Sequence, residues 1–438
     1  MQITIHRGID QIGGCITEIS TARSKILIDL GRNLPKGDKP AKDDMDNPEF
    51  IRRLCKGCDA IFYTHYHGDH VDLFRHVPDH VPQYIGSLAK QVMHIRLEQL
   101  THIPEEKEQH QTDVALLDRF RTYETKQRIP VGQDIWITPY FVSHSAADAY
   151  MFLVEADEKR VLHTGDFRGH GYLSKGLIPM LQKYIVPKDI DVLICEGTML
   201  AREDKNLLCE YELKVKAVEL MQRYKNVFVL CSSTDIDRLA TFHAANKQMH
   251  NRPFVCDSYQ QKILNLFTAT AGQKSNLYKF DQNVIGSNEN NVKLRNWMMD
   301  KGFTMLVRKS DKYRHWVESL LPHLNPAETV LIYSMFQGYI LPTHTAFTPS
   351  MQTFVNMFPK YVYLHTSGHA TTDVLTEVCQ TVNPHTAIIP IHREKNTDFA
   401  WLAISDRLRS RIVTSSQIID GIRIKIEQYF LTDENQLP

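Results

Sequence analysis

The feature that most constrains this chain is the string Thr64–His70, THYHGDH, which directly follows the apolar run Ala60–Tyr63. It places three imidazoles and a carboxylate within six positions: His65, His67, Asp69 and His70. If the run forms a buried strand, the first two histidines project to one face and can reach one ion. The glycine between the two pairs lets the chain turn, so the last two side chains can serve a second ion nearby. The string therefore predicts a dinuclear metal site.

Length and composition bound the remaining possibilities. With 438 residues, of which 42% are hydrophobic, the chain is long enough for two lobes with separate cores. Lys plus Arg and Asp plus Glu each total 51, so nucleic-acid binding would have to come from a local basic surface.

The sequence begins in a strand-like pattern without an apolar signal core, and no apolar stretch is long enough to span a bilayer. We therefore expect a cytoplasmic protein with no membrane partner. Eight scattered cysteines fit reduced core thiols better than a disulfide framework. The single CxxC, Cys55 and Cys58, has no second pair and is weak evidence for a zinc or redox site.

Short apolar runs recur along the chain and end in residues that bind metal or move protons. They precede Asp29, the string His65–His70, Asp166, Glu196, the segment His365–His369, and His392. Segments of helical spacing alternate with these runs, for example around residues 212–224 and 373–382, which indicates an α/β protein. One polar residue at a strand end is commonly a cap, but several such ends predict one shared site.

Together these motifs resemble the metallo-β-lactamase superfamily and, more narrowly, its β-CASP nucleases, which include ribonuclease J and the endonuclease of pre-mRNA 3′-end processing. The chain is similar to the family at each motif in order: Asp29, His65-x-His67-x-Asp69-His70, His144, Asp166, Glu196, His369 and His392. The resemblance covers nearly the whole chain.

The resemblance implies a four-layer αβ/βα sandwich with an inserted β-CASP cap domain. On this view, residues 1–205 form the N-terminal part of the metallo-β-lactamase domain, 206–360 form the cap, and 361–438 complete the first domain. Substrate would lie between the two lobes. Ribonuclease J carries a further C-terminal domain that this chain does not match, so oligomeric state and protein partners stay open.

The resemblance also implies a ligand set for two ions per chain. The first ion would be held by His65, His67 and His144, and the second by Asp69, His70 and His392. Asp166 would bridge both ions, and Asp29 would orient ligands without binding. Zinc suits these imidazole and carboxylate ligands, although manganese is not excluded.

Two cations at such a site lower the pKa of a bridging water far enough to supply hydroxide that attacks phosphorus. We expect His369, held by Glu196, to donate the proton to the leaving oxygen, so that the catalytic residues are Asp69, Glu196 and His369. Backbone N–H groups near Ser367 and Gly368, faced by Ser233 from the cap, are candidates to hold a substrate phosphate.

The leading hypothesis is a metal-dependent ribonuclease that cleaves single-stranded RNA. The nearest alternative is a DNA nuclease, because His163–Arg168 is reminiscent of the Artemis-like DNA-repair branch of the same family. A catalytically idle subunit is disfavoured, since every motif position holds a competent residue. A small-molecule hydrolase is disfavoured as well, because such an enzyme needs neither the cap nor the last two histidine motifs.

Overall fold

Three β-sheets organise the chain in the computed structural model, which describes residues 1–39, 43, 45–202, 207–281 and 284–427. The first sheet has eight strands in the order β19 (Gln417–Ile419), β20 (Ile422–Ile426), β1 (Gln2–Arg7), β2 (Ile16–Ser20), β3 (Lys25–Ile28), β4 (Ala60–Phe62), β5 (Gln83–Gly86), β6 (Arg121–Tyr123). The second has six: β18 (Ala387–Ile391), β11 (Val192–Glu196), β10 (Lys159–His163), β9 (Ala149–Ala156), β8 (Ile135–Val142), β7 (Ile129–Val131).

The third sheet also has six strands, and all of its neighbouring strands are parallel. Their order is β14 (Val284–Gly286), β13 (Phe254–Cys256), β15 (Phe303–Val307), β12 (Asn226–Cys231), β16 (Thr329–Ser334), β17 (Tyr361–Tyr363). The central strands β12, β15 and β16 are buried along their whole length, as expected for a parallel sheet covered on both faces.

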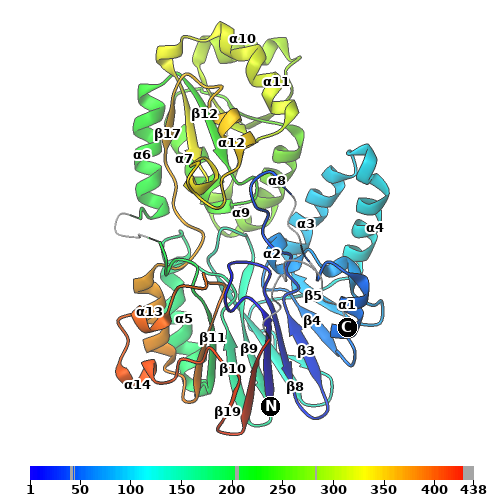
Figure 1. Ribbon diagram of the computed structural model, residues 1–438. Coiled ribbons are helices and arrows are strands. Elements are labelled where there is room, and N and C mark those ends of the chain that lie inside the picture. The colour runs from blue at the N-terminus through cyan, green and yellow to red at the C-terminus, as the bar shows by residue number, and fades with distance from the viewer. Residues whose placement is uncertain (40–42, 44, 203–206, 282–283, 428–438) are drawn as a thin grey trace.

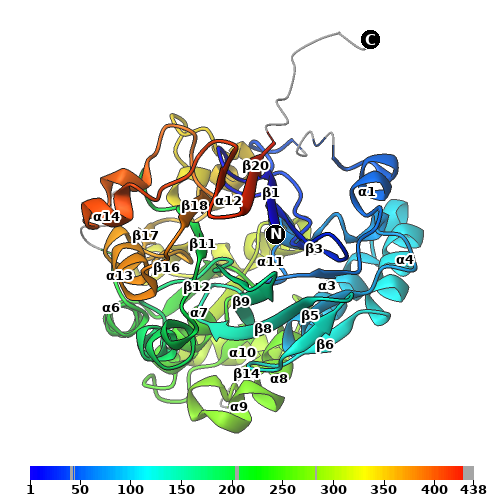
Figure 2. The ribbon, with the colours of Figure 1, turned by 90° about the horizontal axis from the view of Figure 1, so that it is seen from below.

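The first two sheets pack face to face through one apolar core. Ile28 and Phe62 from the first sheet and Phe152 and Ile194 from the second are fully buried in it. Helices cover the outer faces: α1 (Pro48–Leu54), α3 (Ser87–Leu100) and α4 (Lys107–Asp118) on one side, and α5 (Leu177–Met180), α13 (Thr372–Val382) and α14 (Asp406–Arg409) on the other. Figure 2 shows this order of helix, sheet, sheet and helix. The predicted four-layer αβ/βα sandwich is thus confirmed.

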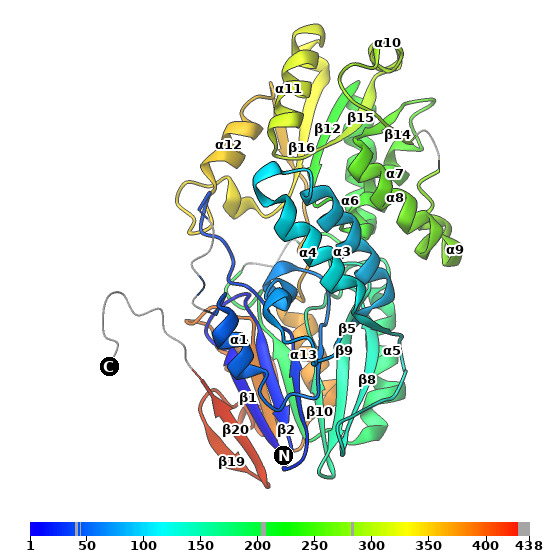
Figure 3. The same cartoon turned by 90° about the vertical axis from the view of Figure 1, so that its right-hand side faces the viewer.

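The third sheet and its helices lie above the sandwich in Figure 1. Their strands fall in the chain between β11 and β18 of the second sheet, so this unit is an insertion. Its helices are α6 (Glu210–Arg223), α7 (Ile236–Asn246), α8 (Ser258–Ala269), α9 (Ala271–Lys274), α10 (Val292–Lys301), α11 (Asp311–Leu320) and α12 (Pro349–Val355). Figure 3 shows α3 of the sandwich beside this unit, where it packs against α8.

The end of the inserted unit differs slightly from the expected division at residue 360. Strand β17, which that division assigns to the first domain, pairs with β16 and belongs to the third sheet. The chain therefore returns to the sandwich only after Tyr363. An apolar run predicts a strand but does not tell which sheet the strand joins, so the pairing with β16 was not predictable.

A buried ion cluster joins the sandwich to the inserted unit. Its members, each at most 5% exposed, are Arg168, Glu210, Asp235, Asp237 and Arg238. Arg168, which follows β10 of the sandwich, contacts Asp237 of α7 at 2.8 Å. Arg238 of α7 donates to the carbonyl oxygen of Thr366, on the segment that returns to the sandwich, at 2.9 Å. The cluster thereby ties the position of the inserted unit to the segment that leads to His369.

None of the helices in the described part of the chain combines the length and apolar character that a membrane crossing requires.

Candidate metal centre

The candidate site lies where strands of the first two sheets end. Strands β10, β11 and β18 are parallel neighbours, so their carboxyl ends meet at one edge of the second sheet. Glu196 is the last residue of β11, and His392 directly follows β18. In the first sheet, β3 and β4 are parallel, and Asp29 directly follows β3. This topology brings together side chains that are far apart in sequence.

The metal-binding string does not continue the strand that precedes it. Strand β4 ends at Phe62, and His65 and His67 lie in the loop between β4 and the short helix α2 (Gly68–Val71). The chain leaves the sheet because Thr64 is bound elsewhere: its N–H donates to the carboxylate of Asp29, and its carbonyl accepts from Tyr150. The expectation of two histidines on one strand face is therefore wrong, although both still turn toward the same site.

The carboxylate of Asp166 lies at the centre of the predicted ligands. Its Oδ2 atom lies 3.1 Å from Nε2 of His70 and 3.6 Å from Nε2 of His392. It lies 3.9 Å from Nε2 of His144 and 4.0 Å from Nε2 of His65. One carboxylate oxygen thus faces imidazoles from both predicted ion sites.

The remaining predicted ligands complete two groups around this carboxylate. Within the first, the ligand atoms of His65, His67 and His144 all lie within 4.8 Å of one another. In the second, Nε2 of His392 lies 3.3 Å from Oδ2 of Asp69, and Nε2 of His70 lies 4.0 Å from the same oxygen. The structure therefore brings all seven predicted ligands together.

Hydrogen bonds from outside the site hold four of these imidazoles in one tautomer. Nδ1 of His70 donates to Asp29 at 2.8 Å, and Nδ1 of His144 donates to the carbonyl oxygen of Gly368 at 2.6 Å. The hydroxyls of Thr64 and Thr198 lie 3.0 and 2.7 Å from Nδ1 of His65 and His392, respectively. Because each hydroxyl can donate to another oxygen, it can accept from the ring. Every Nε2 lone pair then points inward, as metal ligands require.

The donor atoms left inside the site fit metal ions. Nε2 of His65 is buried and has no hydrogen-bond partner among the described residues. Nε2 of His144 and Nδ1 of His67 face each other at 3.2 Å. A buried polar atom without a partner costs free energy, and a cation shared by these lone pairs would satisfy them.

The electrostatics of the first ion site and of Asp166 favour the protonation states that bind cations. Burial lowers the pKa of His67 to about 4 and lowers the pKa values of His65 and His144 well below their usual range, which keeps these rings neutral. Burial opposes ionisation of Asp166, but the neighbouring His392 and His70 hold its pKa well below the usual range.

His70 differs: burial disfavours its charged form, but Asp166 and Asp29 raise its pKa well above the usual range. Neutral imidazoles and an ionised carboxylate are the forms that coordinate a metal, so an ion bound at His70 would displace a proton from that ring.

Glu196 and His369 form a pair at the rim of the same site. Nδ1 of His369 lies 3.0 Å from Oε2 of Glu196 and 3.7 Å from Oδ2 of Asp166. Burial disfavours the charged ring, but the charges of these two carboxylates outweigh it and raise the pKa of His369. The His369 side chain is 19% exposed, whereas that of Glu196 is fully buried. The ring is therefore a solvent-accessible proton donor beside the ligands.

The three residues expected near a substrate phosphate have different surroundings. The hydroxyl of Ser367 donates toward the sulfur of Met199 at 3.3 Å and accepts from the N–H of His369 at 3.1 Å. The carbonyl of Gly368 accepts from His144. Ser233 lies after β12 in the inserted unit, where its hydroxyl is 3.5 Å from that of Tyr259. Ser367 and Gly368 thus border the site through His369 and His144.

Sequence reasoning missed three residues that contact the ligands. Thr64 and Thr198 orient His65 and His392, and the only sequence signal was their position inside two motifs. Cys15 was not singled out at all, although its thiol lies within 4.8 Å of a ring nitrogen of His70 and of His392. The pair Gly13–Gly14, both at positive φ, brings the chain to Cys15 directly before β2.

The fold and the His/Asp site define a protein of the metallo-β-lactamase type, and the comparisons with known proteins agree. Residues 25–230 match the family model described as a beta-lactamase superfamily domain. This match and the RNase J-like relatives support a metallo-β-lactamase, RNase J-like family for the chain, as the motifs predicted. The superfamily implies metal ions, and the His/Asp cluster to hold them is present.

An RNase J-like protein of Methanocaldococcus jannaschii is 26% identical over 199 residues, which are 45% of this chain and 42% of that protein. Ribonuclease J of Helicobacter pylori is 28% identical over 180 residues, which are 38% of this chain and 23% of that protein. The matched stretches thus span less than half the length of these relatives.

A solved structure supports the fold over a longer range. The crystal structure of a protein of unknown function from Enterococcus faecalis V583 has a TM-score of 0.67 to this chain at 18% sequence identity. The likeness covers 92% of this chain and 98% of that one.

Proposed function

We propose that the protein is a metal-dependent phosphodiesterase that cleaves single-stranded RNA. The observation that carries the proposal is the placement of His369, a proton donor, 3.7 Å from Asp166 at the centre of the candidate ligands. The similarity to RNase J-like proteins supports ribonucleic acid as the substrate class.

The proposed ions are two per chain, with zinc as the expected metal and manganese as the alternative. When bound, such a pair would make water nucleophilic at neutral pH and would stabilise charge on a phosphoryl group. His65, His67 and His144 would hold one ion, and Asp69, His70 and His392 the other, with Asp166 between them.

The chain's own residues would complete the reaction around the phosphate. His369 would donate a proton to the leaving oxygen, because its pKa is raised and its ring reaches solvent. Glu196 would hold that ring in place, since its Oε1 accepts from the N–H of Phe167 at 3.0 Å. A fixed donor aimed at the reacting group avoids reorganisation during the reaction.

Side chains beside the site suit a single strand. The guanidinium of Arg202 lies over the ring of Phe336 at 4.5 Å, and Phe336 also contacts Tyr339 and His344. Electrostatic effects place this group beside the metal centre. The charge of Arg202 lowers the pKa of His369, against the carboxylates that raise it. Burial and the charge of Asp69 raise the pKa of Tyr339. Cations with aromatic rings bind unpaired bases without reading sequence. This group is therefore our candidate contact for RNA next to the metal centre.

The resemblance to DNA-repair nucleases rests on the segment His163–Arg168. The surroundings of the first and last residues of this segment weaken the DNA-nuclease hypothesis. Arg168 is fully buried in the ion cluster, and His163 is 1% exposed with its Nε2 atom 3.4 Å from the hydroxyl of Thr17. Neither side chain is free to contact a duplex. DNA cleavage accordingly remains an outcome of the test.

The test is cleavage of an end-labelled single-stranded RNA by protein loaded with zinc or manganese and by chelated protein. We expect the wild-type protein to cleave the RNA only with metal. We expect the metal-loaded His369→Ala variant to lose cleavage. His385→Ala is the matched control, because that histidine is 45% exposed and pairs with Asp189. Cleavage that survives both chelation and His369→Ala would contradict the proposal.

A further inference from the structure

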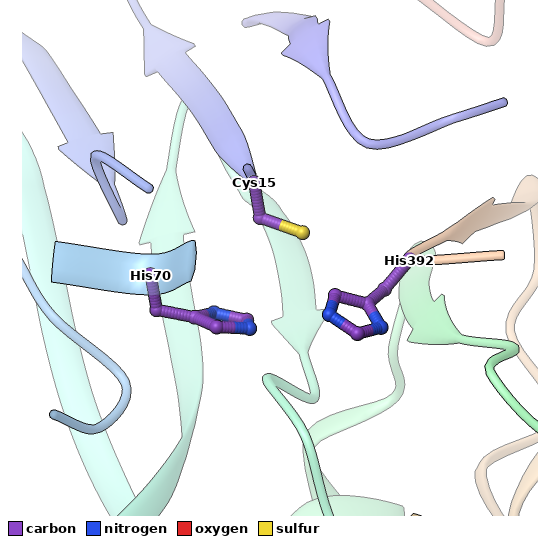
Figure 4. Close-up of side chains that lie close together, drawn as sticks. All are labelled: Cys15, His70 and His392. Atoms are coloured by element: carbon purple, nitrogen blue, oxygen red, sulfur yellow. The ribbon is translucent and has the colours of Figure 1, made fainter. Parts of the chain in front are cut away.

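The thiol of Cys15 lies beside the second predicted ion site. Ligand atoms of Cys15, His70 and His392 all lie within 4.8 Å of one another, and each residue is 1% exposed. Figure 4 shows that the three side chains come from separate segments and face one common space. A buried thiol packed against apolar side chains alone would have no such neighbours.

The position of Cys15 is held by the metal-binding string itself. Its N–H donates to the carbonyl oxygen of Asp69 at 3.1 Å, and its carbonyl accepts from the N–H of Gly31 at 3.0 Å. The backbone of Cys15 therefore keeps a constant relation to two predicted ligands, Asp69 and His70. Rotation about one side-chain bond is the main freedom left to the sulfur.

One of the two imidazoles turns its Nε2 atom toward this space. Nε2 of His70 is buried, lies 3.1 Å from Oδ2 of Asp166 and makes no hydrogen bond of accepted geometry within the described residues, while Nδ1 is bound to Asp29. A sulfur and a nitrogen bound to one tetrahedral zinc ion at about 2.3 and 2.0 Å lie about 3.5 Å apart. A contraction of at most about 1.3 Å from the 4.8 Å limit, which rotation of the thiol and small shifts of the rings can supply, would let the three side chains share one ion.

We propose that the Cys15 thiolate is a ligand of the second metal ion, in addition to the histidines and carboxylates. Binding would release the thiol proton to solvent and form a metal–sulfur bond. Sulfur ligands favour zinc, cobalt and cadmium over manganese and magnesium, so Cys15 would select a softer ion. The inference rests on the metal centre of the proposed function.

X-ray absorption at the zinc edge of the zinc-loaded full-length protein tests this directly. We expect a sulfur shell at about 2.3 Å. That shell should disappear in Cys15→Ser, whose preference for zinc over manganese should fall about tenfold or more. The matched control is the double variant Cys55→Ser/Cys58→Ser, which removes the other candidate pair and should keep the shell.

A zinc site with only nitrogen and oxygen neighbours, a sulfur shell that survives in Cys15→Ser, or a protein that binds no zinc would overturn the inference. If Cys15→Ser does not fold, the wild-type spectrum still decides, because Cys15 is the one cysteine in the metal-ligating groups of the described residues. RNA cleavage without a sulfur shell would reject the inference alone. A sulfur shell without RNA cleavage would reject only the proposed function.

Discussion

Nδ1 of His369 lies 3.0 Å from Oε2 of Glu196, and backbone N–H groups of Phe167 and Ala370 donate to the other oxygen of that carboxylate. These two backbone hydrogen bonds hold the carboxylate in the position from which it contacts the ring. We predict that His369→Ala lowers the cleavage rate by roughly 10²- to 10⁴-fold, because it removes a proton donor. Glu196→Gln should have a milder effect, since an amide can still hold the ring. Metal content should stay unchanged in both variants; its loss in His369→Ala would make that residue a ligand.

The pH dependence of cleavage should report the charge around His369. Glu196 and Asp166 raise the pKa of His369, and the protonated ring is the active form. The rate should therefore fall as pH rises through that raised pKa, above the usual value of about 6.5. Glu196→Gln removes one raising charge, so its decline should begin at lower pH. If the profiles of kcat/KM against pH coincide for the wild type and Glu196→Gln, the His369 ring is not the titrating donor.

Elemental analysis should find about two metal ions per chain, because seven side chains exceed what one tetrahedral ion can use. His392→Ala should lose about one ion, since its Nε2 contacts Asp69 and Asp166. The surface variant His385→Ala should keep both. A stoichiometry near one in the wild type, unchanged in His392→Ala, would contradict the dinuclear assignment.

The sequence predicted the residues of the candidate site better than it predicted the contacts that hold those residues in place. Motifs at the ends of apolar runs were sufficient, because parallel strands such as β10, β11 and β18 end at one edge. The sequence did not predict that β4 ends before His65 and His67. The contacts that end this strand come from Asp29 and Tyr150. The same holds for Cys15, which meets His392 only after the first two sheets have packed.

The buried ion cluster was also beyond sequence reasoning, and it makes a stability prediction. Arg168→Met leaves Glu210, Asp235 and Asp237 buried with one cation fewer. The free energy of unfolding should fall by about 3 to 5 kcal/mol. Arg119→Met is the matched control: its arginine is 52% exposed and pairs with the exposed Asp79, so the loss should be under about 1 kcal/mol. Equal losses in denaturant unfolding would refute a special role for the cluster.

The most direct test of the central claim is kcat/KM for one sequence prepared as single-stranded RNA, double-stranded RNA, single-stranded DNA and duplex DNA. All four are measured with the same metal-loaded protein and again after chelation. We predict that single-stranded RNA is cleaved fastest, and only with metal, because aromatic and cationic side chains bind unpaired strands and RNA alone presents a 2′-hydroxyl. Faster cleavage of duplex DNA would contradict the account and favour a repair nuclease.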